Sequence, residues 1–186
     1  VHVLQFLVDL GLTVEDARAD YNYALRFAAQ KRHIHVLQFL ANIGLTAEDA
    51  RTNNNYAFCN AAENGHIHIL QFLVNFGLTV EDARADDNYA FRYAAENGHV
   101  NVLQFLVDFG LTAQDARTND NCAFRWAAEN GHIKVLQFLF DLGLTAQDVR
   151  ANNNYAFGYA AKNGHVHVLQ FLVDLGLTAE DARTND

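Results

Sequence analysis

Closely spaced histidines are the first feature of this sequence that could do chemistry. Three pairs have the pattern His-x-His, at positions 33 and 35, 66 and 68, and 165 and 167. Imidazoles bind zinc, but a zinc site needs three or four ligands that converge on one point. Two side chains separated by one residue at the start of a helix point in different directions, and no cysteine or second pair completes a set. We therefore expect no metal site, and we interpret these histidines as turn and surface residues.

Acidic residues form a second recurrent pattern, in which Asp follows Glu or Gln and stands two residues before Arg, as in Glu48-Asp49-Ala50-Arg51. Paired carboxylates can act as general acid and base, but only in a cleft that perturbs the pKa of one of them. Here the acids occupy the first turn of a predicted short helix, where the helix dipole alone explains them. Nucleophile elbows, glycine-rich phosphate loops and zinc-spaced cysteines are absent from the sequence. We therefore predict neither enzyme activity nor a cofactor.

Charge and composition exclude two further classes of partner. Lys and Arg total 13 against 22 Asp and Glu, a net charge of −9, whereas nucleic acids and anionic lipids attract basic surfaces. No apolar run reaches the roughly 18 residues of a membrane span. We therefore expect no nucleic-acid partner and no membrane partner. Cys59 and Cys122 are too few for a disulfide framework, so we expect free thiols and favour an intracellular compartment.

The elements that carry these residues repeat every 33 residues. The segment Val3-Leu4-Gln5-Phe6-Leu7 returns almost unchanged, beginning at Val36, Ile69, Val102, Val135 and Val168. A fixed period of about 20–50 residues is typical of a solenoid, in which each unit buries its apolar face against its neighbours. The sequence predicts a single array over 1–186. A partial unit at 1–20 precedes five complete units at about 21–53, 54–86, 87–119, 120–152 and 153–186.

One unit contains three predicted helices. The first runs from about Tyr56 to Glu63, is capped by Asn55 or a neighbour, and ends at Asn64-Gly65, because glycine enters the left-handed conformation without strain. The second, at about 66–76, is so widely apolar that neighbouring units must cover it on several sides. The third, at 78–84, has the Thr and Asp of a capping box. Nothing alternates with a period of two, so the predicted fold class is all-α.

These motifs resemble those of the ankyrin-repeat family. The resemblance lies in the 33-residue period, the small pair Ala94-Ala95, the turn Glu96-Asn97-Gly98-His99 and the apolar helix from Val100 to Phe109. Two features depart from the family: its Thr-Pro-Leu-His entry is here Tyr89-Ala90-Phe91-Arg92, and its β-hairpin finger is replaced by the segment that we expect to be helical. The resemblance implies a non-enzymatic scaffold that binds an unidentified protein, largely through finger tips and the inner face of the first helix.

Two neighbouring positions of the first helix vary between units, whereas most positions hardly change. One holds Arg26, Cys59, Arg92, Arg125 and Gly158, and the next holds Phe27, Asn60, Tyr93, Trp126 and Tyr159. Arg, Tyr and Trp are the residue types that anchor protein interfaces. Our hypothesis is a partner-binding site made of Arg92, Tyr93, Arg125 and Trp126, with Asp87 and Asp120 at its rim. Drift on a solvated face is the alternative explanation of the same variation.

Three further predictions concern the stack itself. An asparagine recurs at positions 22, 55, 88, 121 and 154, and we interpret this column as a ladder of caps and backbone hydrogen bonds. Arg32 replaces the turn glycine of the other units and Gly158 lies inside a first helix, so both positions should be weak. The near-identical units and the apolar, uncapped segment from Val1 to Leu10 suggest an alternative function, a structural module that associates with itself.

Overall fold

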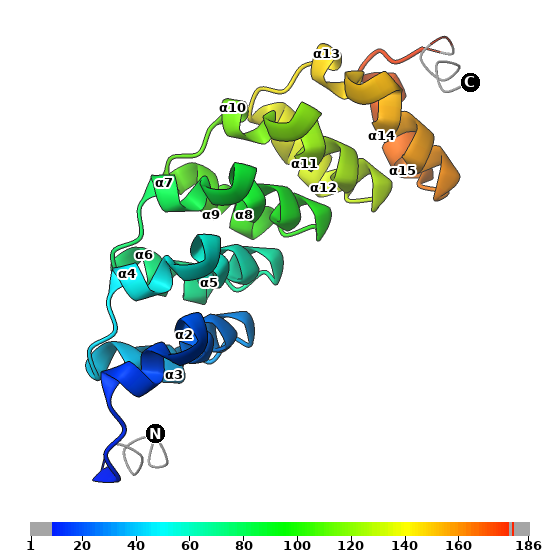
Figure 1. The fold of residues 1–186 in the computed structure, drawn as a ribbon. Helices are drawn as coiled ribbons and strands as arrows, with labels where there is room; N and C mark the ends of the chain where they lie inside the picture. The colour runs from blue at the N-terminus through cyan, green and yellow to red at the C-terminus, as the bar shows by residue number, and fades with distance from the viewer. Residues whose placement is uncertain (1–8, 179, 181–186) are drawn as a thin grey trace.

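In the computed structural model, which describes residues 9–178 and 180, the chain forms a curved stack of helices (Figure 1). No strand occurs among these residues. The all-α solenoid predicted from the 33-residue period is therefore confirmed. Most of the Val1–Leu10 segment lies outside the described residues.

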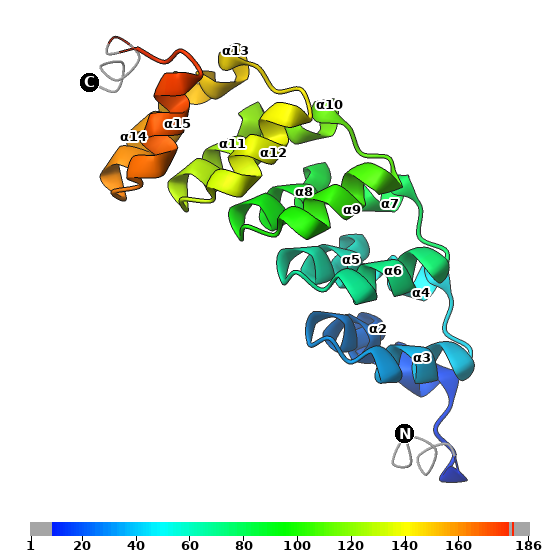
Figure 2. The same cartoon turned by 180° about the vertical axis from the view of Figure 1, so that it is seen from behind.

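The helices form two layers and a row along the outer edge of the arc (Figures 1 and 2). The first layer holds the first helix of each unit: α2 (Val14–Gln30), α5 (Thr52–Glu63), α8 (Ala85–Glu96), α11 (Thr118–Glu129) and α14 (Ala151–Lys162). The second layer holds the second helices: α3 (Ile34–Asn42), α6 (Ile67–Asn75), α9 (Val100–Phe109), α12 (Ile133–Asp141) and α15 (Val166–Asp174). Short helices form the row: α4 (Ala47–Ala50), α7 (Val80–Ala83), α10 (Ala113–Ala116) and α13 (Ala146–Val149).

Each short helix is fixed by the capping box that its sequence predicts. At α7 the Thr79 backbone N–H donates to Asp82 Oδ2 at 2.7 Å, and the Thr79 hydroxyl donates to the same oxygen at 3.1 Å. A helix of one turn cannot persist without such end contacts, because it has few internal hydrogen bonds. The prediction that residues 78–84 form a helical segment instead of a hairpin finger is confirmed.

A left-handed bend links each short helix to the first helix that follows. Asn53, Asn54 and Asn55 have φ angles of 56°, 55° and 56°, and the equivalent residues of the next two units are also Asn or Asp with positive φ. Short polar side chains tolerate this conformation better than other non-glycine residues. The bend places the regular part of α5 after Asn55, as predicted.

The asparagine column forms hydrogen bonds between successive first helices, but it does not cap them. The amide nitrogen of Asn88 in α8 donates to the Thr118 hydroxyl at the start of α11 at 2.8 Å, and that of Asn22 in α2 donates to Thr52 at the start of α5 at 3.3 Å. Among the described atoms, the side-chain oxygens of Asn22, Asn55 and Asn88 accept no hydrogen bond. Our prediction of asparagine caps is therefore wrong, because an N-cap acts through its acceptor oxygen.

Large apolar side chains alternate with alanines in the core between units. Phe58, Phe91 and Phe124 are fully buried, as is the pair Ala61-Ala62. The alanines let successive first helices approach closely, and each buried large side chain contributes about 1.5–3 kcal/mol. Every unit therefore depends on its neighbours for burial.

Glycine and histidine pack together at the turn between the first and second helices. Gly65 has φ 73°, and a Cβ atom there would lie 2.9 Å from the imidazole of His99 in the next unit. The turn histidines after the first also contact the preceding unit, as when His66 Nε2 lies 3.0 Å from the carbonyl oxygen of Gln30. Arg32, with φ 62°, confirms that the turn is left-handed even where glycine is missing.

Candidate protein-binding face

The arginines of the variable column hold the left-handed bends. Arg92 donates from Nε to the carbonyl oxygen of Asp87 at 2.7 Å and from Nη2 to that of Asp86 at 3.0 Å. Arg125 donates in the same way to Asp120 at 2.9 Å and to Asn119 at 3.0 Å. Both arginine residues are half-buried. The bend turns two carbonyl groups toward the helix, and the planar fork of arginine matches them.

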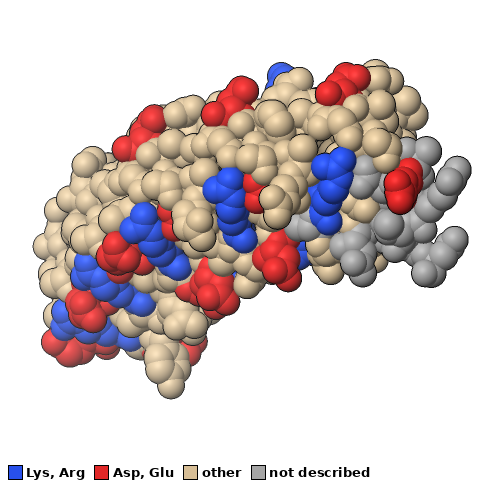
Figure 3. Space-filling view, turned by 90° about the horizontal axis from the view of Figure 1, so that it is seen from above, with Lys and Arg blue, Asp and Glu red and all other residues tan. Residues whose placement is uncertain are grey.

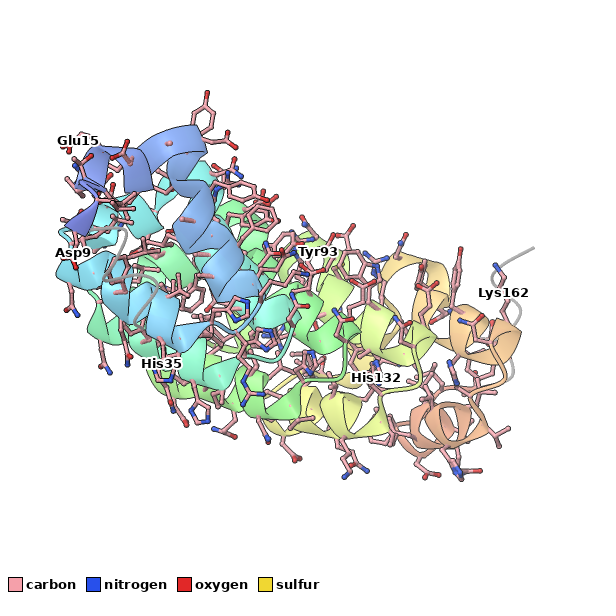
Figure 4. The ribbon with its side chains drawn as sticks, turned by 90° about the horizontal axis from the view of Figure 1, so that it is seen from below. Asp9, Glu15, His35, Tyr93, His132 and Lys162 are labelled. Atoms are coloured by element: carbon pink, nitrogen blue, oxygen red, sulfur yellow. The ribbon has the colours of Figure 1, made fainter. Side chains whose placement is uncertain are left out.

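Half-buried aromatic rings lie beside these arginines on the first-helix layer. The rings of Tyr93 and Trp126 are 5.2 Å apart at 60°, and the Arg92 guanidinium lies 5.7 Å from the Trp126 ring. The structure thus brings Arg92, Tyr93 and Trp126 together, whereas Arg125 lies 4.9 Å from the ring of Tyr155. Figure 4 shows Tyr93 and His35 on opposite sides of the stack.

Asp87 and Asp120 are exposed and adjoin these arginines through their backbones. All six residues of the predicted site therefore lie on the first-helix layer.

A tyrosine and glutamate ladder, which our sequence interpretation missed, supports the same face. The Tyr89 hydroxyl donates to Glu63 at 2.8 Å, and the Tyr155 hydroxyl donates to Glu129 at 2.6 Å. Burial and the neighbouring carboxylate raise the pKa of Tyr89. The signal was available in the sequence as a Tyr 26 residues after a Glu, but it is visible only when two units are compared.

Cys122 interrupts this ladder in the fourth unit. It stands where Tyr89 and Tyr155 stand in their units, so Glu96 has no tyrosine donor. Burial raises the pKa of Glu96, and the negative charges of Glu63 and Glu129 raise it further. The positive charge of Arg92 acts in the opposite direction and lowers the pKa of Glu96.

A second ladder links the units along the outer edge. Arg51 donates from Nε to Asp82 Oδ1 of the next unit at 2.9 Å and from Nη2 to the carbonyl oxygen of Gly77 at 2.9 Å. Arg18, Arg84 and Arg117 form the same bridge to Asp49, Asp115 and Asp148. Figure 3 shows basic and acidic side chains alternating along this edge.

These acids are structural and are poorly suited to proton transfer. Burial would raise the pKa of Asp82, but the hydrogen bonds from Arg51 and Thr79 outweigh it and lower the pKa. A carboxyl group of low pKa stays ionised at neutral pH and cannot serve as a general acid. Our sequence interpretation, which invoked the helix dipole alone, was incomplete because the arginine comes from a different unit.

The histidine pairs diverge, as their spacing predicted. His66 faces the Gln30 carbonyl, whereas the Nδ1 of His68 lies 3.3 Å from Gln71 Oε1. In the part of the chain that the structure describes, no group of three or more His, Cys, Asp or Glu side chains could hold a metal ion.

Both cysteines are free and buried, which confirms the prediction of unbonded thiols. Burial raises the pKa of Cys59 to about 12. Its thiol is therefore protonated at neutral pH, and a protonated thiol is a poor nucleophile.

Comparison with known families agrees with this architecture. A family profile described as ankyrin repeats (3 copies) matches residues 25–115 and also residues 58–153. The chain belongs to the ankyrin-repeat family, whose members are generally protein-binding scaffolds and typically not enzymes. A search of curated proteins finds no match. Among the described residues, no helix is both long and apolar enough to cross a membrane.

Proposed function

We propose that this protein is a non-enzymatic scaffold that binds another protein through the face made by α8 and α11. Arg92, Tyr93, Arg125 and Trp126 form the centre of the site, and Asp87 and Asp120 form its rim. The observation that carries the proposal is the cluster of Arg92, Tyr93 and Trp126, with a ring separation of 5.2 Å on the first-helix layer.

The contacts within the cluster favour tight binding. Hydrogen bonds to two carbonyl groups hold the Arg92 guanidinium in place before a partner arrives. Ordering a flexible side chain at an interface costs about 0.5–1.5 kcal/mol, and this arginine is largely ordered already. Aromatic groups that present a wide, stiff surface complete the composition of a hot spot.

The test measures binding and stability in the same variants. A partner is first isolated by pull-down, and its affinity is then compared for the parent, Trp126→Ala and Tyr159→Ala. Tyr159 occupies the same column in the fifth unit and serves as the matched control. Trp126→Ala should lose about 2 kcal/mol of binding free energy or more, whereas Tyr159→Ala should stay near the parent.

Arg92→Ala and Arg125→Ala should weaken binding and also lower the melting temperature, because each arginine holds two backbone carbonyl groups. If the folded variants bind as tightly as the parent, this face is not the interface. Light scattering over a range of concentrations tests the alternative of self-association, since particles of a self-associating module grow with concentration and those of a monomeric scaffold do not.

A further inference from the structure

We infer that a pocket between α5 and α8 binds an arginine side chain of the protein partner, an inference that rests on the proposed scaffold function. The pocket has a volume of about 210 Å³, and its lining includes Asn53, Asn54, Cys59, Asn60, Asp86 and Tyr89. It lies where the second unit carries Cys59 in place of the arginine of its neighbours.

The junction between α11 and α14 shows how the chain fills the equivalent position. There Arg125 donates to two carbonyl groups of the left-handed bend, at 2.9 Å and 3.0 Å. Its guanidinium lies 4.9 Å from the centroid of the Tyr155 ring. The Tyr155 hydroxyl donates a hydrogen bond to Glu129 at 2.6 Å, and the Tyr155 ring stacks on the Tyr159 ring with centroids 4.0 Å apart. Bend, ring and carboxylate together form a receptor for one guanidinium group.

The junction between α2 and α5 repeats the bend and the ring, with Gln30 in the position that Glu129 holds. Arg26 donates to the carbonyl oxygens of Tyr21 at 2.8 Å and Asp20 at 2.9 Å. Its guanidinium lies 5.2 Å from the ring of Tyr56 in the next unit. Two junctions of the same array thus hold an arginine in the same way.

The junction between α5 and α8 has the receptor but lacks the arginine. The Tyr89 hydroxyl donates a hydrogen bond to Glu63 at 2.8 Å, and the Tyr89 ring stacks on the Tyr93 ring with centroids 4.0 Å apart. Tyr155 makes the same two contacts in its unit. The bend is formed by Asn53 and Asn54, the residues six and five positions before Cys59. Among the described side chains, only the Cys59 thiol donates to either carbonyl oxygen, at 3.7 Å to Asn54. A thiol is a weak donor, and it leaves space that a guanidinium group would fill.

The residues around the pocket favour a cation. Asp86, an exposed acid, lines the pocket at the position that Asn152 holds at the α11 and α14 junction. Glu63 accepts the hydrogen bond of the Tyr89 hydroxyl and adds a second carboxylate near the pocket. The whole chain has a net charge of −9. Arg92 and Arg125 occupy successive units, so the face accommodates guanidinium groups at neighbouring positions.

The geometry favours arginine over lysine. Two carbonyl oxygens and a ring face match the fork of a guanidinium group, which donates from two nitrogens in one plane and stacks on aromatic rings. An ammonium group is a compact charge and cannot span both carbonyl groups while it faces the ring.

The test uses the whole chain labelled with ¹⁵N and titrated with N-acetyl-arginine amide, a probe that presents the side chain as a protein would. We expect saturable shifts of the backbone amides of residues 53–60 and 86–89. N-acetyl-lysine amide and N-acetyl-citrulline amide should bind at least about tenfold more weakly, because the first lacks the fork and the second lacks the charge. Equal binding of all three probes, or no saturable shift with arginine, would overturn the inference.

Substitutions in the pocket locate the binding. Cys59→Arg supplies the missing side chain from the chain itself and should abolish the arginine-dependent shifts. Cys59→Ser leaves the pocket open and should bind like the parent. Gly158→Arg adds the same charge at the equivalent position of the fifth unit and should also bind like the parent. Asp86→Asn, an exposed substitution that copies Asn152, should weaken binding of the arginine probe several-fold. This variant tests the pocket even if Cys59→Arg does not fold.

These measurements separate the pocket from the scaffold proposal. If the probe binds the parent chain and does not bind Cys59→Arg, the same variant should bind the isolated protein partner at least about tenfold more weakly than the parent does. A partner that requires Trp126 but binds Cys59→Arg as tightly as the parent would overturn the arginine pocket and leave the scaffold proposal intact. If Cys59→Arg abolishes binding of the partner and Trp126→Ala has no effect, the arginine pocket is supported and the proposed site around Trp126 is overturned.

Discussion

Single residues at the turns determine how closely one unit follows the next. Gly65, Gly98 and Gly131 each have positive φ, and a Cβ atom at any of them would lie within 3.0 Å of the histidine ring of the next unit. Arg32 stands at this turn in the first complete unit with φ 62°. A non-glycine residue in this conformation carries a penalty of about 1–2 kcal/mol.

Arg32→Gly should therefore raise the free energy of unfolding by about 1–2 kcal/mol, because glycine adopts the same backbone without strain. Urea denaturation followed by circular dichroism measures the change. Gly65→Ala is the matched substitution in the opposite direction and should lower stability, since its methyl group would meet His99. A decrease with Arg32→Gly would contradict the account of the turn.

The residue scale is also where sequence and structure differ most. The types and spacing of Arg92, Tyr93 and Trp126 indicated a shared face, and the structure places them within contact distance. The pairing of Tyr89 with Glu63 was not predicted, because its partners lie in different units. The direction of the Asn88 side chain was not predictable either, since an amide can act as donor or acceptor at a bend.

Among the elements, the short helices such as α7 depend most on one side chain. Asp82 closes the capping box of α7 and also accepts the hydrogen bonds of Arg51 from the preceding unit. Helix formation and stacking of units therefore share one carboxylate. The sequence identified the capping box from local spacing, whereas the bridge to Arg51 requires the geometry of the stack.

Asp82→Asn should lower the free energy of unfolding by about 1.5–3 kcal/mol, the usual contribution of hydrogen bonds to a charged group. The substitution keeps the size of the side chain and removes its charge and one acceptor oxygen. Glu81→Gln is the control on the same helix, because Glu81 is exposed and an exposed pair contributes less than about 1 kcal/mol. Similar losses for both variants, measured by urea denaturation, would contradict the role of Asp82.

At the scale of the whole molecule, stability should follow pH in two stages. The pKa values of His66 and His132 are lowered, chiefly by burial. The unfolded chain therefore binds protons at these groups first, and stability should fall as pH drops below about 6.5. The pKa values of Asp49, Asp82, Asp115 and Asp148 are lowered as well. Their contribution is complete above about pH 4 and is lost as pH falls through the folded-state values.

Denaturation midpoints between pH 8 and pH 3 measure both stages. We expect a shallow decrease from about pH 6.5 and a steeper one below about pH 4, because four bridges outnumber the two histidines. In Asp82→Asn the steeper stage should shrink and the shallow stage should persist. A midpoint that is constant between pH 8 and pH 3 would contradict the roles assigned to the buried histidines and to the arginine–aspartate bridges.

The bridge from each arginine to the aspartate of the following unit has a direction, and this direction bears on how such a chain can grow. Each of the units at 21–53, 54–86 and 87–119 supplies one arginine to the unit after it and one aspartate to the unit before it, as the first complete unit does with Arg51 and Asp49. A tandem duplication of 33 codons would insert a unit that supplies both an arginine for the next unit and an aspartate for the preceding one. The bridge at the point of insertion would therefore be replaced by two equivalent bridges. The array can therefore lengthen in evolution by whole units without losing a bridge of this ladder, and the copies can then diverge at the two variable columns of the first helix.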